Sequence, residues 1–184
     1  MKQKKFGLSL LLSCTLCSML NAQILMGASA RFNNSFAEWD IYDDSLDQGG
    51  TLNMTWQQPD DWSQWSYRLG EKTGTIKTKW SGDFSQWEIR GENKVITATM
   101  TWRGDPRQWR ITDNTVSLDL ISAAGNIFNE WIVTDGKRGT FKMTLEDGFD
   151  LRDWAIEDEL DETICFPMKM TLVFLAVFCS VPKN

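Results

Sequence analysis

Residues 83–111 read DFSQWEIRGENKVITATMTWRGDPRQWRI and contain one full copy of a repeat and the start of the next. The unit begins at Asp83, places a tryptophan at Trp87, and begins again at Asp105, twenty-two residues later. A fixed period of this length indicates tandem supersecondary units. The repeat therefore decides the architecture before any single motif does.

Six tryptophans mark the repeat along the chain: Trp39, Trp65, Trp87, Trp109, Trp131 and Trp154. Their separations are 26, 22, 22, 22 and 23 residues. Two residues after each tryptophan stands Ile, Tyr or Val, and three residues before it stands a bulky or ring-bearing residue. Four residues before it, an aspartate recurs in four copies: Asp61, Asp83, Asp105 and Asp150. We interpret these tryptophans and aspartates as the structural residues of the repeat.

Within a copy, two alternating runs indicate two β-strands. Apolar and charged residues alternate over residues 87–90, and apolar residues alternate with threonines over residues 96–102. A period of two is typical of strands with one apolar face. The intervening residues 91–94 have the Gly and Asn content of a hairpin loop. At the start of each copy, the aspartate is expected to accept backbone N–H bonds in a short turn.

We therefore predict an all-β protein, an antiparallel meander of about six tandem 22-residue β-hairpin repeats. Twelve strands laid flat would span about 57 Å, so twist favours a curled sheet or a barrel-like closure. A β-solenoid with one coil per copy is the alternative, because its period would be similar. The tandem hairpins are similar in arrangement to the single-layer sheet of the spirochaetal outer-surface lipoproteins. The Trp-rich unit has no counterpart there, so no family is assigned.

The C-terminal segment differs from the repeats. Residues 168–181, bracketed by Pro167 and Pro182, are nearly all apolar on both alternating faces. The segment is too short for a membrane-spanning helix, which needs about twenty residues. We predict an apolar C-terminal strand over residues 168–181 that is buried on both faces and closes or caps the sheet.

Residues 1–22 have the features of a signal peptide: three lysines near the start, an apolar stretch, and Ala22 before the expected cleavage point. Residues 23–184 then form a single β-repeat domain without a transmembrane segment. We expect a secreted protein, or one held in the periplasm or at the surface of a bacterial cell. Lipidation of Cys14 is left open as an alternative processing route.

Charge and composition argue against several classes of function. The formal net charge is −6, and removal of the leader leaves sixteen basic against twenty-five acidic residues, about −9. Such an acidic chain is a poor candidate for binding nucleic acid. The absence of histidine excludes a Ser-His-Asp triad and a His-ligated zinc site. We expect no metal and no cofactor, and a disulfide between Cys165 and Cys179 is left open.

The predicted function is a non-enzymatic β-repeat protein with a binding or structural role at the cell surface or in the periplasm. Its partner is unknown, with a protein or a glycan of the cell envelope as the candidates. The tripeptide Arg103-Gly104-Asp105 matches a cell-adhesion motif, but Asp105 stands in the turn-capping position of the repeat.

The alternative function is a carbohydrate-binding module that uses tryptophans of the connectors between copies. Ten tryptophans represent on the order of 2,000 Å² of apolar surface, so most of them must lie in the core. Trp62 is the candidate ligand-binding residue, because it lies in a connector where other copies have Phe, Pro or Leu.

Overall fold

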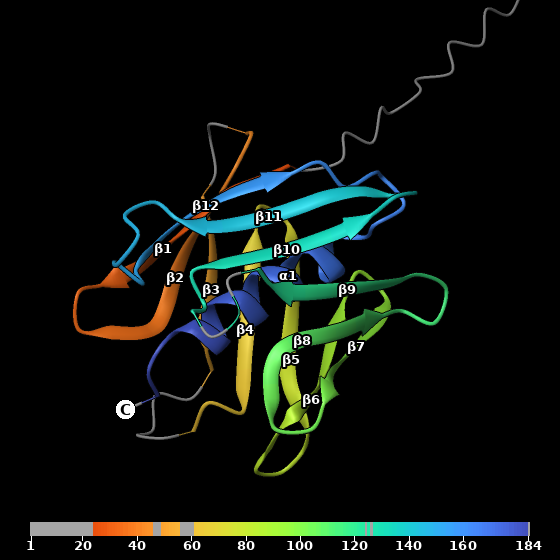
Figure 1. The fold of residues 1–184 in the computed structure, drawn as a ribbon, viewed down its shortest axis with the longest axis horizontal. Helices are drawn as coiled ribbons and strands as arrows, with labels where there is room; N and C mark the ends of the chain where they lie inside the picture. The colour runs from red at the N-terminus through yellow and green to blue at the C-terminus, as the bar shows by residue number, and fades with distance from the viewer. Residues whose placement is uncertain (1–23, 46–48, 56–60, 124, 126, 184) are drawn as a thin grey trace, which may run out of the picture.

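The computed structural model describes residues 24–45, 49–55, 61–123, 125 and 127–183, so the predicted leader lies outside the described residues. The described residues form twelve β-strands and one α-helix (Figure 1). The strands are β1 (Leu25–Phe32), β2 (Ser35–Asp43), β3 (Gly50–Met54), β4 (Gln64–Leu69), β5 (Lys72–Trp80), β6 (Asp83–Gly91), β7 (Lys94–Trp102), β8 (Asp105–Thr112), β9 (Ser117–Ser122), β10 (Glu130–Asp135), β11 (Gly139–Leu145) and β12 (Asp153–Asp158). They are followed by the helix α1 (Phe166–Ser180).

The sheet is a closed antiparallel meander. Each strand pairs with the next one, and β12 returns to pair with β1, where Ala28 stands opposite Trp154. The predicted all-β meander with barrel-like closure is confirmed. The solenoid alternative is wrong, because each strand pairs antiparallel with its neighbour in sequence. Because the sheet is closed, its arrangement differs from the open single-layer sheet of the spirochaetal outer-surface lipoproteins.

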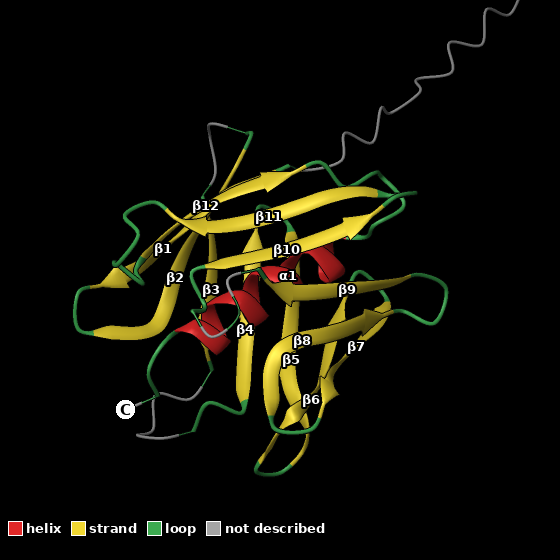
Figure 2. Cartoon of the chain, in the orientation of Figure 1, coloured by secondary structure: helices red, strands yellow, loops and turns green. Residues whose placement is uncertain are grey.

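The interior of a twelve-stranded barrel is too wide for ordinary side chains to fill. Eight strands already give an interior that side chains just fill, and the diameter grows with strand number. Here the six repeat tryptophans are each at most 1% exposed: Trp39, Trp65, Trp87, Trp109, Trp131 and Trp154. These large side chains narrow the lumen, and α1 occupies what remains (Figure 2).

The predicted C-terminal strand over residues 168–181 is wrong, because this segment is a helix inside the barrel. α1 is buried from Phe166 to Phe178. The pairing of β1 with β12 leaves no sheet edge to which a further strand could add. A helix pairs its own backbone N–H and C=O groups, so it can lie in an apolar interior without a neighbouring strand. Its apolar side chains on all sides suit that central position.

Aromatic contacts hold α1 against the strands. The Phe174 ring lies 4.7 Å from that of Trp87, and the Phe178 ring lies 4.9 Å from it, both edge-on. Trp131 donates its indole N–H to the Ser180 hydroxyl at 3.0 Å. The repeat tryptophans therefore position the helix as well as the sheet. No helix in the described ranges is long and apolar enough to span a membrane.

A buried ion pair joins α1 to the barrel wall. Lys169 Nζ donates to Asp158 Oδ2 at 2.8 Å, and both side chains are at most 3% exposed. The same carboxylate accepts the backbone N–H groups of Leu25 and Leu160 at 3.2 and 3.3 Å. Because Leu25 belongs to β1 and Asp158 to β12, the pair also ties together the two strands that close the barrel.

Cys165 and Cys179 are free cysteines. They are fourteen residues apart, which corresponds to roughly 21 Å along a helix. A disulfide requires Cα atoms within about 7 Å of each other. Formation of α1 therefore keeps the two thiols apart, and the bond left open in the sequence does not form.

Replacement of Trp87 by alanine tests the packing between sheet and helix. We expect Trp87→Ala to lower the free energy of unfolding by about 3–5 kcal/mol, because it leaves a cavity between the strands and α1. Urea unfolding followed by circular dichroism measures the loss. In the control Trp102→Ala, where the side chain is 65% exposed, the change should stay within about 0.5 kcal/mol. A loss below about 1 kcal/mol in Trp87→Ala would contradict the packing.

A second prediction concerns the buried ion pair. Lys169→Met leaves the Asp158 carboxylate buried without its cation, so we expect the free energy of unfolding to fall by about 3–5 kcal/mol. The double variant Lys169→Met with Asp158→Asn removes the orphaned charge and should recover part of this loss. Urea unfolding of both variants gives the comparison. A double variant no more stable than Lys169→Met would show that the orphaned charge is not the cause.

Candidate functional site

All links that lead into a copy of the repeat lie at the same end of the barrel, because the meander reverses direction at every strand. These links are β1–β2, β3–β4, β5–β6, β7–β8, β9–β10 and β11–β12, and we call this end the connector end. The hairpin loops within copies lie at the opposite end, where α1 begins. Figure 1 shows α1 running through the barrel between the two ends.

The repeat aspartates cap the connectors. Asp83 Oδ1 accepts the Ser85 N–H at 2.8 Å, and Asp105 Oδ1 accepts the Arg107 N–H at 3.1 Å. The equivalent contacts are made by Asp61 and Asp150. The pKa of each of these four carboxyl groups is lowered, chiefly because the side chain of the residue two positions later donates a hydrogen bond to it. In Asp105 the Arg107 guanidinium lowers the pKa to about 2.

The repeat tryptophans are held by the same turns. Five of them donate the indole N–H to the backbone carbonyl three residues earlier, at 2.9–3.0 Å: Trp39, Trp65, Trp87, Trp109 and Trp154. The side chain at that earlier position packs on the indole, as Phe84 does on Trp87 with 5.9 Å between ring centres. These indoles face the core and contribute no surface for a ligand.

Trp62, the ligand-binding candidate from the sequence, is not available to a ligand. Its side chain is only 7% exposed. The ring packs on Trp65 at 5.7 Å and on Phe178 at 6.5 Å. The Lys183 ammonium lies 6.0 Å from the ring centre. Trp62 therefore fills the same core position as the Phe, Pro or Leu of other connectors, and its assignment as a binding residue is corrected.

Exposed apolar side chains gather instead at the tips of the connectors. Ten large apolar side chains are exposed in the described ranges, and five of them lie away from the connectors: Ile24, Met26, Tyr42, Val95 and Ile121. The other five lie at or directly beside five different connectors. They are Phe32, Trp80, Trp102, Ile127 and Phe149. Their exposed fractions run from 46% for Phe32 to 96% for Phe149. The connector end therefore carries an incomplete apolar ring around the barrel mouth.

Trp80 and Trp102 are exposed because they end the inward-facing columns of β5 and β7. They stand opposite Asp83 and Asp105, respectively, across two-residue turns. The columns thus continue beyond the packed interior, leaving the indoles 58% and 65% exposed. The alternating pattern placed both residues on the apolar face and missed this exposure. Their position directly before a tight turn was the signal that could have revealed it.

Charged side chains surround these two indoles. Asp105 and Arg107 form a two-contact ion pair, with Nε–Oδ1 at 2.7 Å and Nη2–Oδ2 at 2.5 Å. Arg103 lies near enough to Asp83 to contribute to the lowering of its pKa, after the hydrogen bonds from Ser85. Arg103 belongs to the two-residue turn between β7 and β8. We call the following set the tryptophan rim: Trp80, Asp83, Trp102, Arg103, Asp105 and Arg107.

A hollow of about 450 Å³ adjoins the tryptophan rim. It is lined by Gly104, Asp105, Pro106, Arg107 and Phe128. The lining residues come from the β7–β8 connector and from the neighbouring β9–β10 connector. The hollow therefore combines an aromatic ring with the Asp105–Arg107 pair beside the exposed indole of Trp102.

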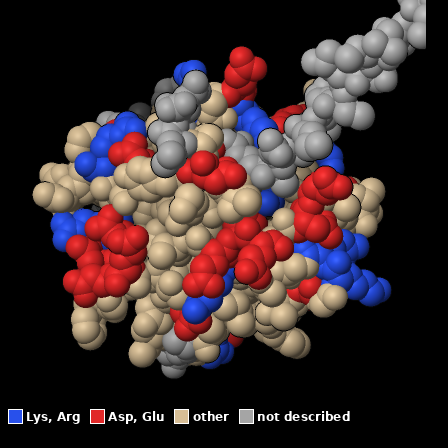
Figure 3. Space-filling model, turned by 90° about the horizontal axis from the view of Figure 1, so that it is seen from above, with Lys and Arg blue, Asp and Glu red and all other residues tan. Residues whose placement is uncertain are grey.

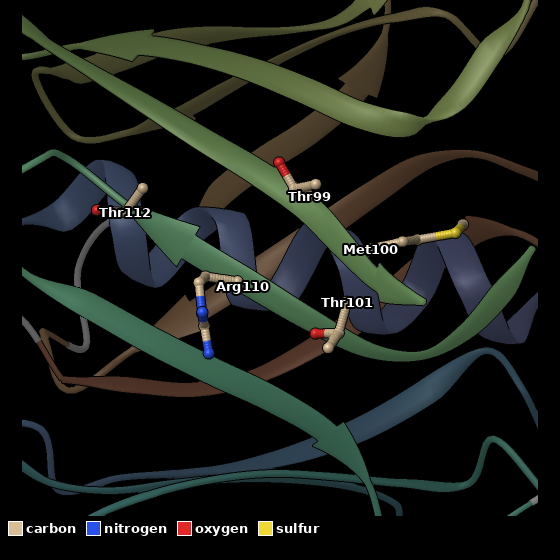
Figure 4. Close-up of a pocket in the computed structure, with 5 residues that line it drawn as sticks. All are labelled: Thr99, Met100, Thr101, Arg110 and Thr112. Carbon is tan, nitrogen blue, oxygen red and sulfur yellow. The ribbon is translucent and has the colours of Figure 1, made fainter. Parts of the chain in front are cut away.

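Another hollow, of about 370 Å³, lies on the barrel wall and is lined by Thr99, Met100, Thr101, Arg110 and Thr112 (Figure 4). Figure 4 shows these residues on two adjacent strands in front of α1. Arg110 is engaged in an ion pair with Asp119 at 3.0 Å. The Thr112 hydroxyl donates to the Val116 carbonyl at 2.8 Å. None of its lining residues is aromatic, whereas Phe128 lines the hollow at the connector end.

At the opposite end, Cys165 stands near charged groups but does not form a reactive site. Lys94 Nζ donates to Asp113 Oδ2 at 3.2 Å. Burial raises the pKa of the Cys165 thiol in spite of this ammonium. Burial likewise raises the pKa of Cys179 to about 12. Both thiols therefore stay protonated near neutral pH, which makes them poor nucleophiles.

The surface charge is mixed. On the face drawn in Figure 3, acidic (red) and basic (blue) side chains lie next to one another. Within the described ranges, no group of three or more acidic or cysteine side chains is placed to hold a metal ion. Comparison of the chain with family models, with curated proteins and with solved structures finds no match.

The low pKa of Asp105 predicts acid sensitivity. The folded-state pKa of about 2 lies below the ordinary value of about 3.9, so this carboxylate stabilises the fold above about pH 4. The contribution is lost as the pH falls from about 4 towards 2. In Asp105→Asn the urea midpoint should fall less steeply over this interval than in the wild type. Parallel curves for the two proteins would contradict the capping role.

Proposed function

We propose that the protein is a non-enzymatic binding protein, exported to the periplasm or surface of a bacterial cell, whose binding surface is the connector end of the barrel. The observation that carries this proposal is the gathering of exposed apolar side chains at that end. The tryptophan rim supplies the two largest of them, Trp80 and Trp102.

The filled interior supports binding at the outside of the barrel. Barrels of this size can hold a ligand in the lumen, but here the repeat tryptophans and α1 occupy it. The rings of Phe174 and Phe178, which belong to α1, pack on Trp87 inside the barrel. A ligand could enter only by displacing α1 and disrupting the core.

The contrast between wall and connector end supports the same surface. Outward positions of β5 and β7 carry threonines and lysines, as in Lys77, Lys79, Thr97 and Thr99. The connector tips instead expose aromatic rings. Exposed apolar groups gathered in one place mark interaction sites, and burial of each such side chain by a partner contributes about 1.5–3 kcal/mol.

The charges at the connector end favour a hydrated partner over a lipid bilayer. The pKa values of Asp83, Asp105 and Asp150 are lowered, chiefly by side-chain hydrogen bonds, so these carboxylates stay ionised at neutral pH. Insertion of the rim into lipid would remove these charges from water at a large cost. A glycan or a protein surface leaves them solvated.

The same carboxylates support a role without catalysis. A general acid near neutral pH needs a raised pKa, as in many hydrolases. Each carboxyl group with a resolved shift in the described ranges has a lowered pKa instead: Asp61, Asp83, Asp105, Asp113, Asp135, Asp150 and Asp161. The arrangement suits turn capping rather than proton transfer.

Export is supported by the leader features of residues 1–22, and the unreactive thiols do not oppose it. An oxidising compartment endangers exposed thiolates. Cys179 is protected, because burial inside the barrel keeps its pKa near 12. The chain can therefore carry two free cysteines outside the cytoplasm without depending on a disulfide.

Binding to cell envelopes tests the proposal. The leader-free protein should co-sediment with envelope fragments of its own bacterium, and Trp80→Ala with Trp102→Ala should weaken this binding by roughly tenfold or more. Ile24→Ala with Met26→Ala is the matched control, because it removes two exposed apolar side chains from the first strand region. Circular dichroism checks that both double variants are folded. Equal co-sedimentation of the rim variant and the wild type would refute the assignment of this surface.

A further inference from the structure

We propose that the ligand of the tryptophan rim is a neutral, extended β-linked polysaccharide whose sugar rings stack on Trp80 and Trp102. This inference rests on the proposed function of the connector end and names the chemical class of its ligand. It replaces the sequence-based candidate Trp62 by two residues whose rings are open to solvent.

The first support is the exposure and chemistry of the two indoles. The flat face of an indole carries partial negative charge, which attracts the polarised C–H groups on one face of a pyranose ring. Such stacking requires an indole that is fixed at its backbone and open on its face. Trp80 and Trp102 end strands beside tight turns and are 58% and 65% exposed.

The second support is the spacing of the two rings. Trp80 ends β5 and Trp102 ends β7, two strands apart in the barrel. Neighbouring strands lie about 4.8 Å apart, which places the two ends roughly 10 Å from each other. This separation matches alternate sugar rings of an extended chain better than two neighbouring rings. The glycan would then cross the ends of β5 to β8.

The third support is the set of polar groups around the rings. Carboxylates accept and guanidinium groups donate hydrogen bonds, so Asp and Arg together suit the adjacent hydroxyls of a sugar. Asp105 and Arg107 supply both at the edge of the hollow of about 450 Å³. Its size is within the range of small-ligand sites, and Phe128 forms part of its apolar lining. Arg103 directly follows Trp102 in the chain and contributes to the lowering of the Asp83 pKa, after the hydrogen bonds from Ser85.

Charge favours a neutral glycan over an anionic one. In the tryptophan rim, the two acidic residues are balanced by the two arginines. The chain as a whole has a net charge of −6, which opposes the approach of a polyanion. The adhesion-motif interpretation of residues 103–105 is also less suitable, because the Asp105 carboxylate is held by Arg107 in two contacts.

Titration with oligosaccharides of defined linkage tests the inference. The probes are the hexamers of β-1,4-linked glucose and of β-1,4-linked N-acetylglucosamine, with the α-1,4-linked glucose hexamer as the control for chain geometry. We expect at least one β-linked hexamer to bind the leader-free protein, to shift tryptophan fluorescence and to reduce quenching by iodide. The α-linked hexamer should bind at least about tenfold more weakly.

The variants locate the binding. Trp80→Ala and Trp102→Ala should each weaken binding by about tenfold, and the double variant should abolish it. Tyr42→Ala is the matched control, because this ring is 46% exposed near the end of β2, at the end of the barrel opposite the connectors. Its affinity for the hexamer should stay within about twofold of the wild type. Thermal unfolding should be unchanged in all four variants.

The outcomes separate this inference from the proposed function. If neither β-linked hexamer binds while the double tryptophan variant loses envelope binding, the glycan inference is overturned and the connector end remains the binding surface. If Phe149→Ala weakens envelope binding as much as Trp102→Ala does, a protein partner that covers the whole mouth is favoured and the glycan inference is also overturned. If the tryptophan variants retain both hexamer binding and envelope binding, the glycan inference and the proposed function are both overturned.

Discussion

The structure depends on an indole that satisfies its only polar group within its own turn. The N–H of Trp87 bonds to the carbonyl of Phe84, and four other copies repeat this bond. Without it, each indole would leave a donor unpaired in an apolar interior, at a cost of about 1–3 kcal/mol. With it, the indole can point inward in these five copies, whereas Trp131 donates its N–H to the Ser180 hydroxyl of α1 instead. The same turn is capped by an aspartate such as Asp83, so one short segment sets both the connector and the core.

Barrel size and helix position follow from this repeat. Five copies supply two strands each, the sixth supplies β12, and β1 precedes the first copy. Together these twelve strands enclose more space than their own side chains fill. A helix that is apolar on all sides fills that space while pairing its own backbone groups. Its single buried charge, on Lys169, meets Asp158 at the seam between β12 and β1. The ion pair thus links the filling of the barrel to its closure.

Much of the fold could be predicted from the sequence, because the relevant interactions are local. The spacing of Trp39 to Trp154 predicted the meander, and the alternation predicted which side chains face inward. The state of residues 168–181 could not be derived in this way, because an apolar run fits a buried strand or a buried helix equally well. The pairing of β1 with β12, which are distant in sequence, closes the sheet and leaves no edge for a further strand. Residues 168–180 are therefore helical, and the helix satisfies its own backbone groups.

The candidate site was predicted only in outline. Alternation shows the face of a strand on which Trp102 lies, but not how far along the barrel axis it stands. Exposure depends on that axial position, so Trp102 was placed in the core and Trp62 at the surface. The structure reverses both placements. The tryptophan expected from the sequence to bind a ligand, Trp62, lies in a connector, whereas Trp80 and Trp102 are the last residues of β5 and β7.

The position of α1 after the twelfth strand has a consequence for biogenesis. A ribosome completes all the strands before it makes the segment that fills their lumen, so the sheet has no interior support during most of translation. Until that segment emerges, inward-facing side chains such as Trp87 lack the rings of Phe174 and Phe178 on which they pack. The core of the barrel can therefore be completed only late in synthesis.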